Sequence, residues 1–289
     1  MPSLTPEAGD SLFAPRAPAI KARRRGVAAR LRARARALIP WLLPILLLAA
    51  WQLLTQSGLV STRILPTLSA VAKAGFKLAL SGELFEHMGI SFARALAGLV
   101  VGGVIGFALG LANGLSQASA RLLDSSLQMI RNVPHLALIP LVILWFGIDE
   151  SAKLFLVALG VFFPIYQNTY HGVRTVDPGL IEMGRVYGLG RRELFWQVIL
   201  PGALPSILVG LRYALGFMWL TLIVAETISA SSGIGYLTMN AREFLQTDVV
   251  VLGILIYALL GKLADMATAV LERRCLAWHP AHQPAEASP

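Results

Sequence analysis

Several polar side chains interrupt long apolar segments of this sequence, at positions where they could contact a passing solute. Proline residues accompany them: Pro134 and Pro140 in one segment and Pro164 in the next. Proline frees a backbone carbonyl, and a polar side chain at membrane depth is costly unless it faces protein or water. We therefore expect a polar path, with Asn132, His135, Gln167, Asn168 and Glu226 as its candidate residues. For any one of them, a hydrogen bond between helices is an equally good interpretation.

No grouping of residues in the sequence is typical of a catalytic or metal site. The single cysteine, Cys275, excludes an intrachain disulfide. His87, His135 and His171 lack the spacing of metal ligands or of an acid–base pair. Gly261-Lys262 lacks the upstream glycine and the Ser or Thr of a phosphate-binding loop. We expect a non-catalytic chain that binds no metal or cofactor and does not hydrolyse ATP itself.

Composition places these segments in a lipid bilayer. Of the 289 residues, 56% are hydrophobic and 14% are charged, whereas a soluble domain is about half apolar and a quarter charged. A net charge of +9 would suggest nucleic acid in a soluble protein. Here the basic residues concentrate between Arg16 and Arg36, directly before the first apolar run. That position favours a cytoplasmic anchor on anionic lipid, and we expect no nucleic-acid partner.

The apolar runs predict an all-α integral membrane protein with six transmembrane helices. Each run approaches the ~20 residues that cross a bilayer. We expect a basic, disordered cytoplasmic tail over 1–37, a first transmembrane helix over 38–57, and a cytoplasmic C-terminal tail over 272–289. The first run could instead be a signal peptide, but no clear cleavage site follows it. The core at 83–271 holds the other five spans, which we place at 90–114, 127–147, 152–171, 204–229 and 248–271.

Basic residues predict the orientation of these spans. The N-terminal tail, the segment 172–200 and the residues Arg273 and Arg274 lie on one side of a six-span chain. The positive-inside rule makes that side cytoplasmic, so both termini are expected in the cytoplasm. The loop 58–90 departs from the rule, because three basic residues lie in it on the opposite side. It also contains an amphipathic stretch around 67–80.

Charges within the last two spans need partners or a route to water. Lys262 and Asp265 lie three residues apart on one helix face, so they are expected to pair, or Asp265 is expected to meet Arg212. Lys262 and Arg212 could instead extend to the cytoplasmic interface.

The span 90–114 has a glycine at every fourth position. In a helix such residues follow one face, and glycine lets another backbone come close. We therefore predict a helix-packing ridge formed by Gly98, Gly102, Gly106, Gly110 and Gly114.

The segment from Asp177 to Pro205 has the pattern of two short amphipathic helices. Asp177-Pro178 is a helix-start signal, glycines at 188 and 190 predict a bend, and Pro201 is expected to end the second helix. An amphipathic cytoplasmic segment of this kind fits the groove of a partner protein. A helix lying on the membrane surface is the weaker interpretation.

This segment resembles the EAA loop of ABC-importer permeases. That pattern is Glu-Ala-Ala, three residues, Gly, nine residues, then Ile-x-Leu-Pro. Glu182, Gly188, Leu200 and Pro201 are in register with it, while Met183 and Gly184 replace the alanines and Val198 replaces the isoleucine. All of these departures are small or apolar.

Further motifs are similar to the branch of that family that carries sulfonates, taurine, nitrate and related anions, and most of all to its aliphatic-sulfonate members. They are Ser91-Phe92-x-Arg94 and the segments 131–140, 144–150 and 224–230. The similarity covers about residues 40–275 and leaves out the tail at 1–37.

The resemblance implies a type I ABC-importer permease fold in a bacterial inner membrane. Two permease copies would form the pore, two cytoplasmic ATPase subunits would hold ATP and Mg, and a periplasmic or lipid-anchored binding protein would deliver an aliphatic sulfonate. The loop 177–201 would couple the permease to the ATPase through Glu182, Met183, Gly184, Gly188, Leu200 and Pro201. Taurine, nitrate or a pyrimidine precursor are alternative cargoes. An ion-coupled secondary transporter is less favoured, because we find no convincing internal repeat.

Overall fold

A computed structural model describes residues 42–278, and this part of the chain contains helices and no strand. The chain divides into two units, one ending at Val60 and the other beginning at Ser61. The described part of the first unit holds one apolar helix, Leu42–Gln56. It lies within the predicted first span, 38–57. The predicted tail 1–37, residues 38–41, and residues 279–289 of the predicted C-terminal tail lie outside the described residues.

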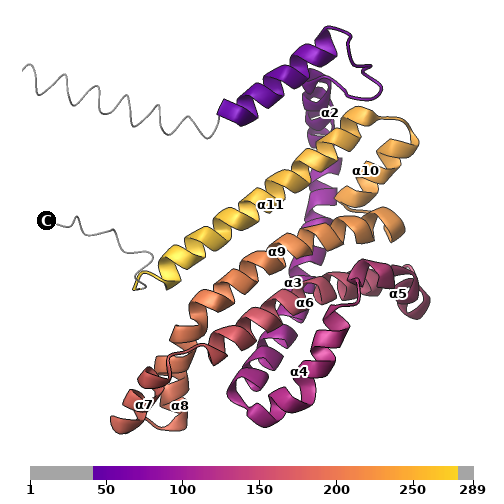
Figure 1. The fold of residues 1–289 in the computed structure, drawn as a ribbon. Helices are drawn as coiled ribbons and strands as arrows, with labels where there is room; N and C mark the ends of the chain where they lie inside the picture. The colour runs from indigo at the N-terminus through magenta and orange to yellow at the C-terminus, as the bar shows by residue number, and fades with distance from the viewer. Residues whose placement is uncertain (1–41, 279–289) are drawn as a thin grey trace, which may run out of the picture. The chain divides into compact units, whose positions relative to one another are not determined.

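The second unit is a bundle of helices of very different lengths (Figure 1). Its elements, in chain order, are α2 (Leu68–Leu80), α3 (Glu83–Leu115), α4 (Gln117–Arg131), the 3₁₀ turn η1 (His135–Leu138), α5 (Ile139–Phe146), α6 (Glu150–Arg174), α7 (Pro178–Val186), α8 (Arg191–Leu194), the π-helical turn η2 (Phe195–Ile199), α9 (Leu200–Ser229), α10 (Ile234–Glu243) and α11 (Thr247–Cys275). The amphipathic stretch expected around 67–80 is α2.

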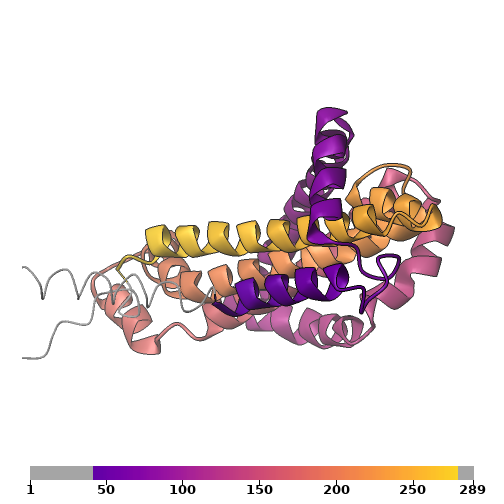
Figure 2. The same cartoon turned by 90° about the horizontal axis from the view of Figure 1, so that it is seen from above.

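Helix α6 lies between α3 and α9, and the three helices together form the central core. Val157, Val161 and Ile165 of α6 pack against Ala95 of α3 and Met218 of α9. Helices α9 and α11 run side by side in both views (Figures 1 and 2). The helices α7 and α8 lie at the first end of α9, while α5 and α10 lie at its other end (Figure 1). The loop 177–201 and the candidate residue Glu226 are therefore held at opposite ends of α9.

The five glycines spaced four residues apart face α6 along its length. A Cβ atom added at Gly106 would lie 2.6 Å from the backbone oxygen of Phe162, and one added at Gly110 would lie 2.8 Å from that of Tyr166. At Gly98 and Gly102 the added atom would meet Val157 and the backbone of Ala158. A Cβ at Gly114 would come 2.7 Å from Val173. The backbones of α3 and α6 thus approach each other at distances that only glycine permits.

The predicted span over 127–147 is not one straight helix, because the chain bends there by 80°. Helix α4 ends at Arg131, and η1 begins only at His135. Pro134 has no N–H to continue the helical ladder, and a proline disfavours the helical conformation in the residue before it. Pro140 does not break the chain further, because it stands in the first turn of α5, where an N–H is not needed.

Pro201 does not end the second helix of the loop, as the sequence had predicted. The helix continues through η2 into α9, from Arg191 to Ile228. Pro201 stands at the start of α9, directly after the π-helical turn. The wider turn accommodates a residue that cannot donate a backbone hydrogen bond to the preceding turn.

Three described helices are long and apolar enough to cross a membrane by themselves: Glu83–Leu115, Arg191–Ile228 and Thr247–Cys275. The bent pair Gln117–Arg131 and His135–Phe146 gives a fourth if it counts as one span. Length and composition thus indicate three or four spans among the described residues.

The predicted charge pairing in the last two spans is also different in the structure. Arg212 pairs with Glu272 at 2.5 Å rather than with Asp265. Among residues 42–278, no ion pair joins Lys262 to Asp265.

Candidate functional site

A cavity of about 590 Å³ opens between the α4–η1 bend, α6 and α9. Its walls are made by Arg131, His135, Leu159, Gly160, Phe163, Pro164, Gln167, Asn168, His171, Tyr213 and Phe217. The bend at Pro134 is what turns Arg131 and His135 toward the polar face of α6. The polar residues that the sequence placed in two separate spans therefore meet in one space.

Hydrogen bonds hold several of these side chains in place. Arg131 Nη1 donates to Gln167 Oε1 at 2.6 Å. The amide of Asn168 donates to the backbone oxygen of Pro164 at 2.9 Å. His135 Nε2 lies 3.5 Å from the Thr221 hydroxyl. The cavity wall thus combines a guanidinium group, side-chain amides and imidazoles with aromatic surface.

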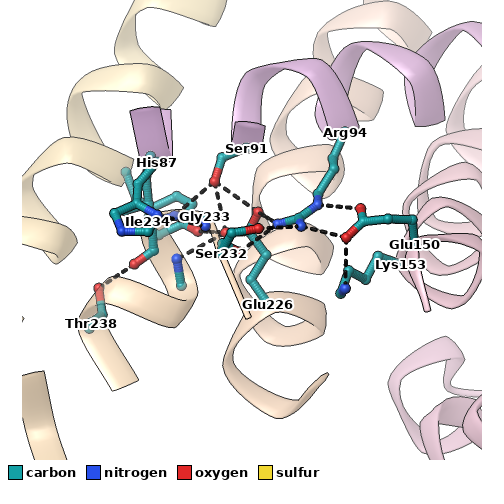
Figure 3. A network of polar contacts seen from close by, with 12 residues as sticks. His87, Ser91, Arg94, Glu150, Lys153, Glu226, Ser232, Gly233, Ile234 and Thr238 are labelled. Carbon is teal, nitrogen blue, oxygen red and sulfur yellow. Dashed lines mark hydrogen bonds and ion pairs between the residues drawn. The ribbon is translucent and has the colours of Figure 1, made fainter. Parts of the chain in front are cut away.

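Of the five predicted path residues, the structure brings three to this cavity: His135, Gln167 and Asn168. Asn132 is exposed beside it and is not one of the lining residues. Glu226 lies in a different place, within a buried group of charged and polar residues (Figure 3).

That second group, here called the Arg94 network, joins α3, α6, α9, α11 and the segment between α9 and α10. Its members are His87, Ser91, Arg94, Glu150, Lys153, Glu226, Ser232 and Tyr257. His87, Ser91 and Arg94 come from α3 at intervals of four and three residues, so they share one face of that helix. The face points at the segment between α9 and α10 (Figure 3).

Arg94 stands at the centre of the network and is almost fully buried. Its guanidinium donates to both carboxylate oxygens of Glu150, each at 2.6 Å, and to Glu226 at 2.8 Å. Lys153 also donates to Glu150, at 3.0 Å. Two cations thus face two carboxylates. Such pairing is required where charges are taken out of water, because an unpaired buried charge costs several kcal/mol.

Glu150 differs from Glu226 in its exposure. The Glu226 side chain is fully buried, whereas that of Glu150 is 64% exposed. Glu150 is the first residue of α6 and precedes the predicted span at 152–171. The hydrogen bond from Arg94, together with that from Lys153, lowers the pKa of Glu150 to about 2. The pair therefore stays ionised at any physiological pH.

The network also binds the start of α10. Gly235 N–H donates to Glu226 Oε2 at 2.9 Å, Ile234 N–H donates to the Ser91 hydroxyl at 2.8 Å, and Gly233 N–H donates to His87 Nδ1 at 3.0 Å. The N-cap residue of α10 is Gly233, which has no side chain to cap the helix and a φ of 108°. Distant side chains thus satisfy donors that a local cap would ordinarily take, and the Glu226 charge suits a helix N-terminus.

The sequence alone did not predict this network, although three of its motifs converge there. They are Ser91-Phe92-x-Arg94, the end of the segment 144–150 and the segment 224–230. The usable signal was charge: Arg94 and Glu226 both stand in apolar segments, and each needs a partner of opposite sign.

The loop between α6 and α9 forms a compact turn of two short helices. Asp177 caps α7 through a hydrogen bond from Gly179 N–H, with Pro178 in the first turn, as the sequence predicted. Gly188 has a φ of 82°, and Leu189 N–H donates back to the Gly184 carbonyl at 3.0 Å. This is the arrangement in which glycine ends a helix in a left-handed conformation.

Gly184, one of the departures from the EAA pattern, is buried where α7 packs on α8. A Cβ there would lie 2.7 Å from a terminal methyl group of Leu194, so that side chain would have to shift to make room for it. Glu182, Met183 and Gly188 are exposed on the turn, while Leu200 and Pro201 are half-buried at the start of α9. The exposed apolar surface of the turn comes from Leu180, Met183, Val186 and Tyr187.

The sequence of this chain matches a known family of membrane proteins. Residues 98–276 match the family described as binding-protein-dependent transport system inner membrane component. The chain belongs to this family. The matched segment runs from the first ridge glycine to the end of α11 and contains the cavity, Glu226 and the loop.

Two relatives of this permease are named for different cargoes. The aliphatic sulfonates transport permease protein SsuC of Escherichia coli (strain K12) is 66% identical over 249 residues, which cover 86% of this chain and 95% of that protein. The taurine transport system permease protein TauC of the same strain is 37% identical over 238 residues, 81% of this chain and 86% of that protein.

The fold is similar to that of a solved transporter. The crystal structure of an amino acid ABC transporter with histidines has a TM-score of 0.57 to this chain, at 17% identity. The match covers 68% of this chain and 96% of that one. At this identity the likeness concerns the fold alone.

Proposed function

We propose that this chain is the permease subunit of an ATP-driven ABC importer and carries aliphatic sulfonates across the bacterial inner membrane. The observation that carries the proposal is the 66% identity to SsuC over nearly the whole of both chains. Identity to TauC is far lower, at 37%. The cavity supports an anionic cargo with an apolar part, because a guanidinium group and aromatic rings line it together.

The proposal includes the coupling role of the loop 177–201. Exposed apolar side chains on a compact two-helix turn, held by a left-handed glycine, form a rigid surface that fits a groove in a partner. The partner would be a cytoplasmic ATPase subunit that carries ATP and Mg, so the permease itself is non-catalytic. Closure of the ATPases would then tilt the permease between inward-facing and outward-facing states.

The assembly would contain two permease copies, two ATPase subunits and a periplasmic or lipid-anchored binding protein. We propose six spans per copy. These are the helix at 38–57, α3, the bent segment α4–α5, α6, α9 and α11. Both termini and the loop would then lie in the cytoplasm, in agreement with the positive-inside rule. Large exposed apolar side chains on α3, α9 and α11 would face lipid or the second copy.

Uptake by cells tests the function and the cargo together. The chain is expressed with its ATPase and binding protein in cells that lack sulfonate importers, and labelled ethanesulfonate, taurine and nitrate are supplied separately. We expect uptake of ethanesulfonate that disappears without the ATPase. Uptake of taurine or nitrate alone would refute the cargo, and uptake that does not need the ATPase would refute the ABC mechanism.

Changes of charge in the loop test the coupling role. Glu182→Lys and Gly188→Asp should leave the protein in the membrane but abolish ATP-dependent uptake. Glu243→Lys is the matched control, because Glu243 is also exposed but lies on α10, at the other end of α9. Normal uptake by both loop variants would contradict the docking assignment.

A further inference from the structure

We propose that the cavity holds the transported sulfonate in one orientation, with the sulfonate group on Arg131 and the alkyl chain against Phe163 and Phe217. This inference rests on the proposed function and adds the residues that recognise each part of the cargo. It assigns to Arg131 a binding role and to Phe163 a role in discriminating chain length.

The first observation is the order of side chains along α6. Leu159, Phe163, Gln167 and His171 all line the cavity at intervals of four residues, so they form a stripe along one face with about 6 Å between neighbours. The stripe is apolar at its first two positions and polar at its last two. A molecule with one anionic end and one apolar end can match this order in only one direction.

The second observation is the charge of the polar end. Arg131 lies opposite Gln167, and none of the described residues that line the cavity is acidic. A guanidinium group offers five N–H donors in a planar fork that matches an oxyanion. The hydrogen bond to Gln167 is the only one that the Arg131 side chain makes among residues 42–278. Most of its donors are therefore left for a ligand.

The contact with Gln167 indicates how the anion would enter and leave. In the structure the amide oxygen of Gln167 accepts a hydrogen bond from Arg131. A sulfonate oxygen accepts in the same way, so the anion can take the place of the amide oxygen, and the Gln167 amide group can then donate to the sulfonate. Exchange of one acceptor for another keeps binding weak enough for release, as a transport site requires.

The apolar end is built by aromatic rings from two helices. Phe217 of α9 packs edge-to-face on His135, with ring centres 6.2 Å apart. This contact places the aromatic ring of Phe217 beside the imidazole of His135, which follows the bend. An alkyl chain that extends from Gln167 toward Phe163 would be covered over the first ~6 Å of its length. Longer chains would reach the level of Leu159.

Direct binding tests the inference without the binding protein, whose own selectivity would dominate uptake. The purified permease–ATPase complex is titrated with methane-, butane- and hexanesulfonate, and binding is measured by calorimetry and by the shift in melting temperature. For the wild type, we expect the dissociation constant to fall by about fourfold for each methylene group that the apolar wall covers.

Two variants should change this series in different ways. Arg131→Met should weaken all three ligands by a common factor of about 10–150, the range for losing a hydrogen bond to a charged group, and Arg131→Lys should lose less. Phe163→Ala should leave methanesulfonate unchanged and flatten the dependence on chain length. Arg121→Met, on α4 but outside the cavity lining, is the matched control and should bind all three ligands as the wild type does.

Unfolding of the unliganded variants separates binding from folding, because Arg131 is exposed and its replacement should leave the melting temperature unchanged. If Arg131→Met binds all three sulfonates as tightly as the wild type, the inference is overturned. A chain-length dependence that Phe163→Ala leaves intact would also overturn it. If the wild-type complex fails to import any sulfonate in cells, the proposed function fails instead, and that result is read from a different assay.

Discussion

The close approach of α3 to α6 makes a quantitative prediction about a single methyl group. Gly106→Ala adds a Cβ atom 2.6 Å from the Phe162 carbonyl oxygen and 3.2 Å from the Tyr166 nitrogen. Both neighbours are backbone atoms of a helix, so neither can rotate away. Gly89→Ala makes the same chemical change on the same helix, at a position where nothing lies within 4 Å of the added atom.

The two variants share one energy term and differ in another. Alanine stabilises a helix relative to glycine by about 0.5–1 kcal/mol, and this gain applies at both positions. Only Gly106→Ala forces α3 away from α6, and overpacking of this kind costs about 1–3 kcal/mol. We therefore expect Gly89→Ala to be slightly more stable than the wild type. Gly106→Ala should be less stable than Gly89→Ala by about 1–3 kcal/mol.

Thermal unfolding in detergent measures the difference, with tryptophan fluorescence as the signal, since Trp219 is buried in the central core. A change of 1 kcal/mol shifts the melting temperature of a protein of this size by roughly 2–4 °C. Gly106→Ala should thus melt roughly 2–12 °C below Gly89→Ala. Gly106→Leu should reduce the folded yield further. If Gly106→Ala melts at or above Gly89→Ala, the backbones of α3 and α6 are not in contact at this position.

The Arg94 network, the loop and the ionised carboxylate at the start of α6 give three more predictions. Arg94→Met leaves the buried Glu226 carboxylate without its cation and should lower the free energy of unfolding by about 3–5 kcal/mol. The double variant Arg94→Met/Glu226→Gln should recover part of this loss. Equal stabilities of the single and double variants would contradict the pairing. Gly188→Ala places a side chain at a φ of 82°, so it should destabilise the turn by about 1–2 kcal/mol and reduce ATP-dependent uptake. The control Gly190→Ala, at a φ of −68°, should do neither. Equal uptake by the two variants would refute the role of the left-handed residue. The pKa of Glu150 is depressed from 4.5 to about 2, so its ion pair stabilises the fold above about pH 4.5 and is lost as the pH falls toward 2. Glu150→Gln should therefore lower the melting temperature at pH 7 more than at pH 3, and an equal effect at both would show that the pair does not titrate as described.

Local patterns in the sequence predicted those elements whose cause is also local. The cap formed by Asp177 and Pro178, the amphipathic helix α2 and the bend at Gly188 depend on residues within one or two turns of each other. The spacing of the glycines was also visible, because a helix repeats its faces at a fixed interval.

The sequence could not supply contacts that depend on how helices meet. Arg94 reaches Glu226 across 132 positions of the chain and Glu150 across 56, and no periodicity relates such residues. Hydropathy also could not reveal the bend within 127–147, since an apolar run is equally compatible with one straight helix and with two helices joined at Pro134. The steric effect of that proline decides between them, and the resulting bend creates the cavity.

The start of α10 depends on residues that come from elsewhere in the chain. Its first amide groups are bound by His87 and Ser91 of α3 and by Glu226 of α9, and Gly233 supplies no cap of its own. The helix therefore cannot begin in a stable way until α3 and α9 have packed together. We expect the amide protons of Gly233, Ile234 and Gly235 to exchange with solvent at a rate set by the opening of the whole bundle, so these three amides would report whether a newly inserted copy has completed its assembly.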